Sequence, residues 1–546
     1  MTSRLREAAL AAALVLGVAL AFHWLLFPRV ADPDSFYHVG HARHYAETSL
    51  LDTSFPWTAH SAIAEEGADL WWGFHALLVP LSGGDDVAAA VRRSAVALTL
   101  VGLLLVALLA LRHRLLDAPL WAPLFFVAVP NVLFRYLAVR PEVLSVPLAL
   151  LLLSALALRR PWAALVAATA ITWVHLSMFW LGPGLCAVWV ASAMADGGAQ
   201  RSGAERAARL RTVPALVFAV GAGTALGWLL RPNPLGAARL AWIQIAELLF
   251  EKTGDTPLTF AVDLAPLDLP TLWVMAWPLL LPWAAGLAVL AWAALRGREA
   301  LRAMPAGERA HLWASLVLAA GFLGLTVVVA RRSLVHWAAF ATLSLALMVT
   351  HLAPGGRREA VSRALLAAFP LLFAYSLWRN ALNVQYVSQP PDAMAEVATW
   401  LSTHAAPGDL VFNTHWDTFG PLFAHNRAVR YVGGMDPIFQ YARDPELYWE
   451  FHHISTDASP AATCPAPVCP EESLRDTHAV LGEDFGARWI VVEPRRNPRL
   501  SLYLLNDPRY RLALETPREA VFERLVAAPA TEAETGSDAR SSGGPG

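Results

Sequence analysis

The stretch that decides the fold is "EAALAAALVLGVALAFHWLLF", residues 7–27, an apolar run at the start of a chain of 546 residues. About 20 apolar residues suffice for a helix to cross the roughly 30 Å hydrocarbon core of a bilayer. The run continues beyond the small residues that end at Ala21, so we interpret it as a retained first helix rather than a cleaved signal. It predicts a membrane protein.

Similar runs recur along the whole chain. Hydrophobic residues make up 56% of the sequence and charged residues only 16%, whereas soluble domains carry about 25% charged residues. The runs predict about eleven membrane-spanning helices, at 7–27, 87–111, 120–138, 143–158, 161–178, 179–195, 213–230, 271–295, 312–330, 333–352 and 364–382. We therefore predict a polytopic α-helical membrane protein.

The arginines indicate how the chain is oriented. They gather in short loops that alternate along the sequence, at Arg4/Arg6, Arg112/Arg114, Arg159/Arg160, 201–211, 296–309 and 357–363. Because basic loops face the cytoplasm, we expect a multi-pass protein of the inner, cytoplasmic membrane with its N-terminus inside. An odd number of spans then places the C-terminal region outside. The outer face also receives the long segments 28–86 and 231–270.

Three domains follow from these patterns. We expect a transmembrane domain at 1–382, a periplasmic α/β domain at 383–528 and a disordered, low-complexity tail at 529–546. In the α/β domain, "DLVFNT" (409–414) and "RWIVVE" (488–493) are typical of buried strands.

Helical spacing and paired cysteines add detail to this domain. Helical spacing after Asp392 predicts a helix with that residue as its N-cap. Cys464 and Cys469 form a disulfide if the domain lies outside the cytoplasm, unless the short loop with two prolines prevents the geometry.

Acidic residues and histidines follow the first span directly. Asp32 and Asp34 lie in "ADPDSFYHVGHARHYAE", residues 31–47. Carboxylates near a bilayer edge are costly unless they are hydrated, paired or bound to a cation, so the pair is either a metal or base site or an ordinary polar turn. The continuation predicts an amphipathic helix along the membrane surface, where His38 and His41 are either metal ligands or interfacial residues.

Further charged residues lie at the outer ends of later spans. Arg140 and Glu142 precede the fourth span, where they either pair with each other or Glu142 shares a cation with Asp34. Asp263 stands in the otherwise apolar "FAVDLAP", which is unexpected in a solvated loop.

Two more groups could contact a ligand. Arg331 and Arg332 lie between two spans on the face that basic residues avoid. They suit an anionic ligand such as a phosphate, or they reach to lipid headgroups. Trp416 and Asp417, in "THWDTFG" after a predicted strand, are either ligand contacts or packing and capping residues.

Together these features resemble the GT-C membrane glycosyltransferases, most closely the catalytic subunit of oligosaccharyltransferase and its bacterial relatives. "DPDSFYHVGHARHYAE" resembles that family's first outer segment, in which an Asp precedes an interfacial helix with Tyr and His. "THWDTFG" is similar to the family's Trp-Trp-Asp-Tyr-Gly motif. Here His415 replaces the first Trp, Thr418 and Phe419 replace Tyr, and Gly420 is displaced by one residue.

The resemblance implies a glycosyltransferase that uses a sugar on a polyprenyl phosphate or diphosphate. Transfer to a protein, glycan or lipid acceptor would take place on the outer face, with membrane lipids and no nucleic acid as partners. The implied catalytic residues are Asp34, Glu142 and Asp32. The implied donor-phosphate ligands are Arg332, Arg331 and Arg140, and the implied acceptor contacts are Trp416 and Asp417. A divalent cation, Mg²⁺ or Mn²⁺, would be held by Asp34 and Glu142, with Asp263 and His38 as further candidate ligands.

Two other classes of function are compatible with the chain. A transporter or flippase of lipid-linked sugars normally needs ionisable or broken-helix positions near the middle of the membrane, whereas these spans carry their charges at the outer ends. A sensor or scaffold would need only the periplasmic domain. The enzyme hypothesis predicts that Asp34, Glu142 and an outer arginine meet in one pocket.

Overall fold

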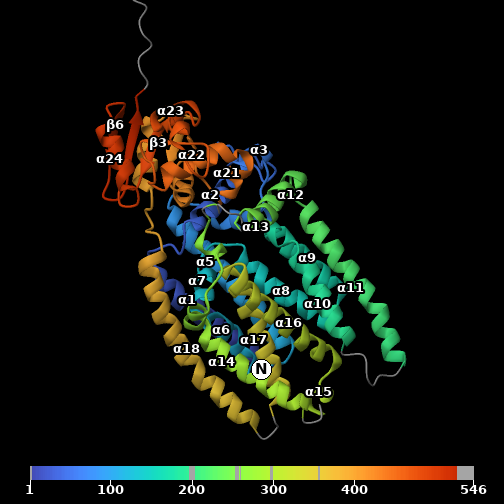
Figure 1. The fold of residues 1–546 in the computed structure, drawn as a ribbon. Coiled ribbons are helices and arrows are strands. Elements are labelled where there is room, and N and C mark those ends of the chain that lie inside the picture. The colour runs from blue at the N-terminus through green and yellow to red at the C-terminus, as the bar shows by residue number, and fades with distance from the viewer. Residues whose placement is uncertain are drawn as a thin grey trace, which may run out of the picture.

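The computed structural model describes residues 3–195, 203–252, 258, 260–295, 299–353 and 357–525. Long helices form a bundle, and a sheet-containing unit built from the C-terminal third of the chain lies at one end of it (Figure 1). The predicted tail at 529–546 lies outside the described residues.

Every predicted span corresponds to helical structure. The matching helices are α1 (Ser3–Leu26), α5 (Val87–Arg112), α6 (Ala118–Val127) with α7 (Pro130–Tyr136), α8 (Glu142–Ala157), α9 (Pro161–Val174), α10 (Leu181–Ala195), α11 (Gly203–Leu229), α14 (Leu269–Leu295), α16 (Ala306–Val328), α17 (Leu334–Leu352) and α18 (Arg358–Val387). Within the described ranges, eight helices are long and apolar enough to cross a membrane. A multi-pass membrane protein is thus confirmed, while the number of spans stays a prediction.

One predicted span is interrupted. The run at 120–138 is divided into α6 and α7, and Pro130 is the first residue of α7. A proline is tolerated in the first turn of a helix but cannot continue a preceding one, because its nitrogen has no hydrogen to donate. The break places Arg135, near the end of α7, beside the loop that leads to α8.

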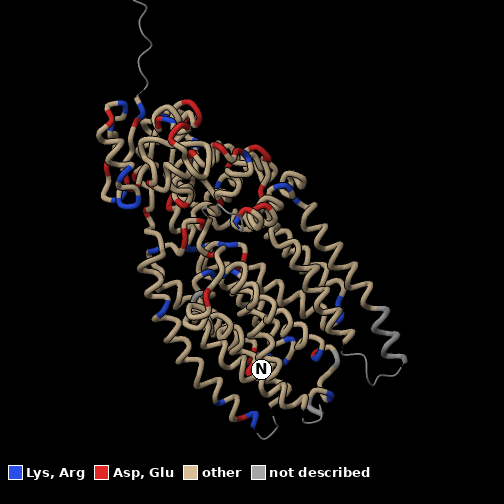
Figure 2. The backbone as a smooth tube through the Cα atoms, viewed as in Figure 1, with Lys and Arg blue, Asp and Glu red and all other residues tan. Residues whose placement is uncertain are grey.

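The charges lie mainly at the two ends of the helix bundle. Figure 2 shows them gathered in the C-terminal unit and in the loops at the far end, with few along the helices between. The N-terminus lies at the end away from the C-terminal unit (Figure 1). Basic residues occupy loops at that same end, as the arginine pattern predicts.

The C-terminal unit is built on a mixed sheet of five strands in the order β2-β1-β5-β7-β6. The strands are β1 (Leu410–Asn413), β2 (Arg430–Tyr431), β5 (Ala487–Val492), β6 (Tyr510–Glu515) and β7 (Ala520–Arg524). β1 pairs in parallel with β2 and β5, whereas β7 is antiparallel to both β5 and β6. The two strands predicted from sequence are therefore neighbours at the centre of the sheet.

Alternate residues of the central strands join two different cores. Phe412 and Ile490 belong to a core within the C-terminal unit, which includes residues of α22 (Pro445–Ser455), α23 (Thr477–Glu483) and α24 (Pro498–Asn506). Val411, Trp489 and Val491 belong instead to the large core that continues into the helix bundle. Because side chains alternate along a strand, the sheet packs on both faces and the unit is docked on the bundle.

The start of the C-terminal unit differs from the prediction in detail. The last long helix, α18, continues to Val387, five residues beyond the predicted span. The next helix, α19 (Ala395–His404), begins after Met394, whose φ of 56° is left-handed and whose side chain makes no capping bond. The prediction that Asp392 caps this helix is wrong, because the left-handed turn starts the helix two residues later.

The helix after the first span is buried within the protein. α2 (Asp34–Glu47) forms as predicted, but ten of its 14 residues are buried. It packs against α4 (Trp72–Leu78) and against α20 (Phe419–His425) of the C-terminal unit. Gly420 makes this contact close, because a Cβ there would lie 2.5 Å from the carbonyl oxygen of Pro33. In the tertiary fold, α2 thus lies between the helix bundle and the C-terminal unit.

The cysteines in the C-terminal unit are paired. Cys464 and Cys469 form a disulfide, and Cys186, in α10, is free and buried. The short loop with two prolines therefore permits the bond that the sequence left open. The short strands β3 (Ala462–Thr463) and β4 (Arg475–Asp476) pair beside this loop.

Candidate active site

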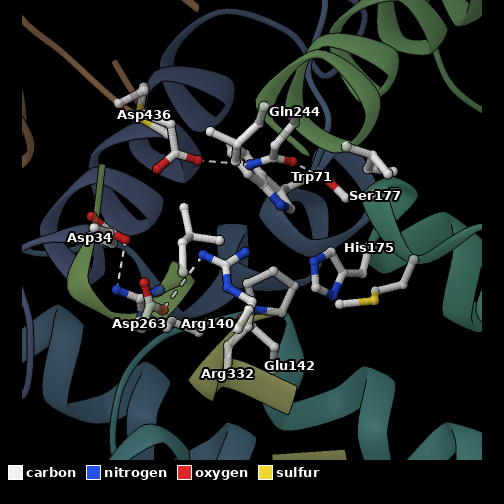
Figure 3. Close-up of a pocket in the computed structure, with 18 of the residues that line it drawn as sticks. Asp34, Trp71, Arg140, Glu142, His175, Ser177, Gln244, Asp263, Arg332 and Asp436 are labelled. Carbon is white, nitrogen blue, oxygen red and sulfur yellow. Dashed lines mark hydrogen bonds and ion pairs between the residues drawn. The ribbon is translucent and has the colours of Figure 1, made fainter. Parts of the chain in front are cut away.

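A cavity of about 270 Å³ lies where the helix bundle meets the C-terminal unit. Its residues come from nine separate stretches of the chain, which only the folded structure brings together (Figure 3). The charged side chains in its wall are Asp34, Arg140, Glu142, Lys252, Asp263, Arg332 and Asp436. The cavity therefore brings together Asp34 and four other residues predicted from the sequence, namely Arg140, Glu142, Asp263 and Arg332.

Arg140 joins the two aspartates that follow the first span. Its Nε donates to Asp32, and its Nη2 lies 2.7 Å from Asp34 Oδ2. Asp32 also accepts from the backbone N–H and the hydroxyl of Ser35, at 3.0 and 2.9 Å, so it holds the first turn of α2. Asp34 lines the cavity and Asp32 does not. The two carboxylates therefore have different positions, one facing the cavity and one supporting the backbone behind it.

Asp34 is poised to exchange a proton near neutral pH. Burial raises the pKa of its carboxyl to about 7; Arg140 opposes the shift, and the carboxylates of Asp32, Asp436 and Asp263 add to it. The side chain keeps 34% of its surface exposed, which leaves its oxygens accessible from the cavity. A carboxyl with this pKa can act as a general base at physiological pH.

A second arginine bridges the other two acids. Arg135 donates from Nη1 to Asp263 Oδ2 at 2.8 Å and from Nη2 to Glu142 Oε1 at 3.3 Å. Arg332 Nη2 lies 3.5 Å from the same Asp263 oxygen. Burial disfavours the charged form of Asp263, but Arg332 and Arg135 hold the pKa of this carboxyl well below its usual range. Glu142 thus pairs with Arg135, not with Arg140 as one sequence interpretation suggested.

Arg332 lines the cavity and has a nitrogen that is unpartnered within the described ranges. Its buried Nε has no partner among the described residues, and its contact with Asp263 is a long one. Arg331, the preceding residue, does not line the cavity, although its own Nε is also buried without a partner in the described part of the chain. Of the three arginines predicted to bind phosphate, Arg332 and Arg140 line the cavity and Arg331 does not.

Part of the cavity lining is apolar. It is formed by side chains that include Met178, Trp180, Leu248, Leu249 and Val329. Several apolar residues of the same segments are exposed on the surface, namely Phe179, Trp180, Leu249, Phe250, Val262 and Val328. The cavity therefore joins a charged wall to an apolar surface, which suits an amphiphilic anion.

The C-terminal unit forms part of the cavity wall. Trp416 and Asp436 line it, and Asp436 accepts a hydrogen bond of 3.0 Å from Gln244 in the π-helical segment Ile243–Glu247. Ser177 donates in turn to Gln244 (Figure 3). Asp417 turns away and pairs with Arg496 at 3.1 Å beside a different cavity. The predicted Trp–Asp pair is thus divided between two surfaces.

The three carboxylates predicted to ligate a metal do not fit a resident divalent cation. Asp34, Glu142 and Asp263 each lie within ion-pair distance of an arginine. They also do not form one of the clusters of His, Cys, Asp and Glu that could hold a metal ion within the described ranges. Guanidinium groups already supply the positive charge beside these carboxylates. His38 lines the cavity, but its Nδ1 faces His75 Nε2 at 2.8 Å.

Several residues of the site escaped the sequence analysis. Arg135 can be recognised in the sequence as a candidate site residue, because a single charge inside an apolar run is costly and usually functional. Trp71 and Gln244 cannot be recognised in this way, since each lies in a segment of ordinary composition. Lys252 donates to the carbonyl oxygen of Leu264 at 2.8 Å, a contact that no local pattern indicates.

The fold resembles that of known structures. No protein-family model and no curated protein matches the chain. The structure of ArnT from Cupriavidus metallidurans in the apo state matches 93% of this chain and 97% of its own, with 13% identity and a TM-score of 0.53. The structure of the same protein bound to undecaprenyl phosphate matches 94% and 98%, with 14% identity and a TM-score of 0.50. ArnT is a GT-C glycosyltransferase, so the predicted GT-C-like fold is confirmed.

Proposed function

We propose that this chain is a membrane glycosyltransferase that moves a sugar from a polyprenyl phosphate or diphosphate carrier to an acceptor outside the cytoplasm. The observation that carries the proposal is the cavity itself, whose lining combines Asp34, Glu142 and Arg332 with apolar side chains. The fold shared with ArnT, one structure of which holds undecaprenyl phosphate, supports it. The acceptor is a protein, a glycan or a lipid.

The two walls of the cavity match the two parts of such a donor. Arg332, with an unpartnered Nε, suits a phosphate oxygen, because a guanidinium group donates in a fork that fits phosphate. The exposed apolar side chains around Trp180 and Leu249 suit a polyprenyl chain that stays in the bilayer. A donor bound in this way places its sugar between Arg332 and the Asp34 side of the cavity.

The transfer requires a base and a stabilised leaving group. An oxygen of the acceptor forms the new bond to the sugar's anomeric carbon while the bond from that carbon to the phosphate oxygen breaks. The phosphate leaves with the electron pair, and Arg332 stabilises its developing charge. Asp34 takes the proton of the acceptor hydroxyl. Arg140 orients the Asp34 carboxylate through the 2.7 Å contact.

Replacing Arg332 tests the phosphate contact. We expect Arg332→Met to raise KM for the lipid-linked donor by about 10- to 100-fold, since a hydrogen bond to a charged group contributes about 1.5–3 kcal/mol. Donor titration with purified protein measures the change. Arg331→Met is the matched control, because it removes the neighbouring arginine outside the cavity. Equal effects of the two changes would contradict the assignment.

We further propose that the C-terminal unit lies outside the cytoplasm and that the membrane is the inner one. Support comes from the basic loops at the far end of the bundle (Figure 2) and from the disulfide of Cys464 and Cys469, since disulfides persist in oxidising compartments. Alkaline phosphatase fused after Leu525 should be active, and the same enzyme fused after Arg114 should be inactive. The reverse pattern would show that the orientation is inverted.

Mass spectrometry of lipid-linked sugars and extracytoplasmic glycoconjugates tests the function directly. Cells that carry Asp34→Ala should accumulate a polyprenyl-linked sugar and lose one glycoconjugate relative to wild type. If the chain were a transporter or flippase, the Asp34→Ala substitution would instead leave the lipid-linked sugar on the cytoplasmic leaflet. A membrane-impermeant modifying reagent cannot reach the sugar there. A sensor or scaffold would be insensitive to the Asp34 substitution. An unchanged glycan profile would contradict the transferase proposal.

A further inference from the structure

A buried cluster of two histidines and an aspartate lies behind the cavity. Asp69 Oδ2 is 2.6 Å from His75 Nδ1 and 3.8 Å from His41 Nε2. The three ligand atoms all lie within 4.8 Å of one another. The side chains of all three residues are at most 2% exposed. A carboxylate and two imidazoles are thus gathered in a space that is closed to solvent.

The remaining polar atoms of these three residues are already held by partners. The other ring nitrogen of His41, Nδ1, lies 3.1 Å from the Tyr37 hydroxyl. The other ring nitrogen of His75, Nε2, lies 2.8 Å from His38 Nδ1. Metal-bound histidines nearly always have such a partner on the second nitrogen, which fixes the orientation of the ring.

The aspartate is oriented in the same manner. Asp69 Oδ1 accepts from the backbone N–H of Trp71 at 2.8 Å, and the Tyr45 hydroxyl donates to Oδ2 at 2.9 Å. The backbone carbonyl of Asp69 accepts from Arg231 at 3.3 Å. All three side chains therefore point one ligand atom each toward a common centre.

One atom at that centre is unsatisfied. His41 Nε2 is buried and has no hydrogen-bond partner among the described residues. Leaving a buried polar atom unpaired costs about 1–3 kcal/mol. Coordination of a cation removes this cost and also neutralises the buried carboxylate.

We propose that His41 Nε2, Asp69 Oδ2 and His75 Nδ1 bind one zinc-class divalent cation. Two imidazoles and a carboxylate are typical ligands of Zn²⁺. Ligand atoms around tetrahedral zinc lie about 3.3 Å apart, a value between the two separations to Asp69 of 2.6 and 3.8 Å. Coordination replaces the hydrogen bond from His75 Nδ1 to Asp69, and the neutral imidazole then carries its proton on Nε2, which faces His38 Nδ1.

The bound ion would link three parts of the segment that follows the first span. It joins α2, which begins at Asp34, to the segment of Asp69 and to α4, which contains His75. Two partners of the ligands, His38 and Trp71, line the cavity. The ion therefore positions one side of the cavity without entering it. This inference goes beyond the proposed reaction and does not depend on it.

Zinc retention by the full-length chain tests the site. The protein, purified in detergent with an affinity tag that lacks histidine, is incubated with zinc chloride and desalted, and zinc per chain is measured by mass spectrometry. We expect His41→Gln to lose one equivalent relative to wild type. This substitution suits the test, because His41 Nε2 has no partner to lose.

His311→Gln is the matched control, since His311 belongs to a second His and Glu cluster, with His113 and Glu308, elsewhere in the described structure. It should leave the equivalent held by His41 in place. In the same preparations, zinc should raise the melting temperature of wild type and of His311→Gln but not that of His41→Gln. Without zinc, wild type and His41→Gln should have similar melting temperatures. The proposal is overturned if wild type retains no zinc or if His41→Gln retains as much as wild type.

Discussion

Replacing Asp34 with asparagine is expected to lower the rate of sugar transfer by about 100- to 10,000-fold, the range for removal of a general base. Asparagine keeps the size of the side chain and can still accept from Arg140, but it cannot take a proton. Release of free polyprenyl phosphate from a lipid-linked donor, followed by mass spectrometry with purified protein, measures the rate.

Asp32→Asn is the matched control for this change. Asp32 belongs to the same motif and contacts the same arginine, but it lies outside the cavity wall. We expect its replacement to reduce the rate less than about tenfold, far less than loss of the base itself. A loss as large as that of Asp34→Asn would show that the two carboxylates act as one unit.

The pH dependence provides an independent check on Asp34. Burial, together with Asp32, Asp436 and Asp263 and against the effect of Arg140, raises the pKa of this carboxyl to about 7. The base works only when deprotonated, so the rate should fall about tenfold per pH unit below that value and level off above it. In Asp34→Asn the residual rate should lose this dependence.

Replacing Arg135 with methionine is expected to cause the largest loss of stability. Arg135 holds both Glu142 and Asp263, at 3.3 and 2.8 Å, and the three side chains are only 13–22% exposed. Removing one partner of a buried pair leaves an uncompensated charge, which costs about 3–5 kcal/mol. We expect a destabilisation of about 3 kcal/mol, since Arg332 still contacts Asp263. Thermal unfolding in detergent measures it as a lower melting temperature.

Arg363→Met is the control for Arg135→Met. Arg363 pairs with Glu359 one helical turn away, and the two side chains are 78% and 92% exposed. An exposed pair contributes about 0–1 kcal/mol, so its melting temperature should hardly change. Equal stability of Arg135→Met and wild type would show that the buried acids do not need this arginine.

Much of the fold was predictable because it depends on local properties. The length of an apolar run determines whether a helix can cross a bilayer, and each predicted span is helical. The strands at 409–414 and 488–493 were recognised by their β-rich composition. The burial of α2 was not predictable, since its contacts with α20 join residues nearly 400 positions apart in the sequence.

The candidate site was predicted in part. Asp34, Glu142 and Arg332 are predictable as charged residues at outer span ends, Asp263 as a charge in an apolar stretch, and Trp416 as a residue that follows a predicted strand. All five line the cavity. Their neighbours Asp32, Arg331 and Asp417 share these patterns and lie outside it. A local pattern cannot distinguish neighbours such as Arg331 and Arg332, because only the helix to which they lead decides which side chain faces the cavity.

The sequence by itself determined that this chain is a membrane protein with a C-terminal α/β unit, because hydrophobic length and strand composition act over about 20 residues or fewer. Only the tertiary structure decided which charges meet. Arg140 and Asp32 are 108 positions apart, and Arg135 and Asp263 are 128 apart. Ion pairs depend on distance in space and on exclusion of water, and neither can be obtained from the order of residues.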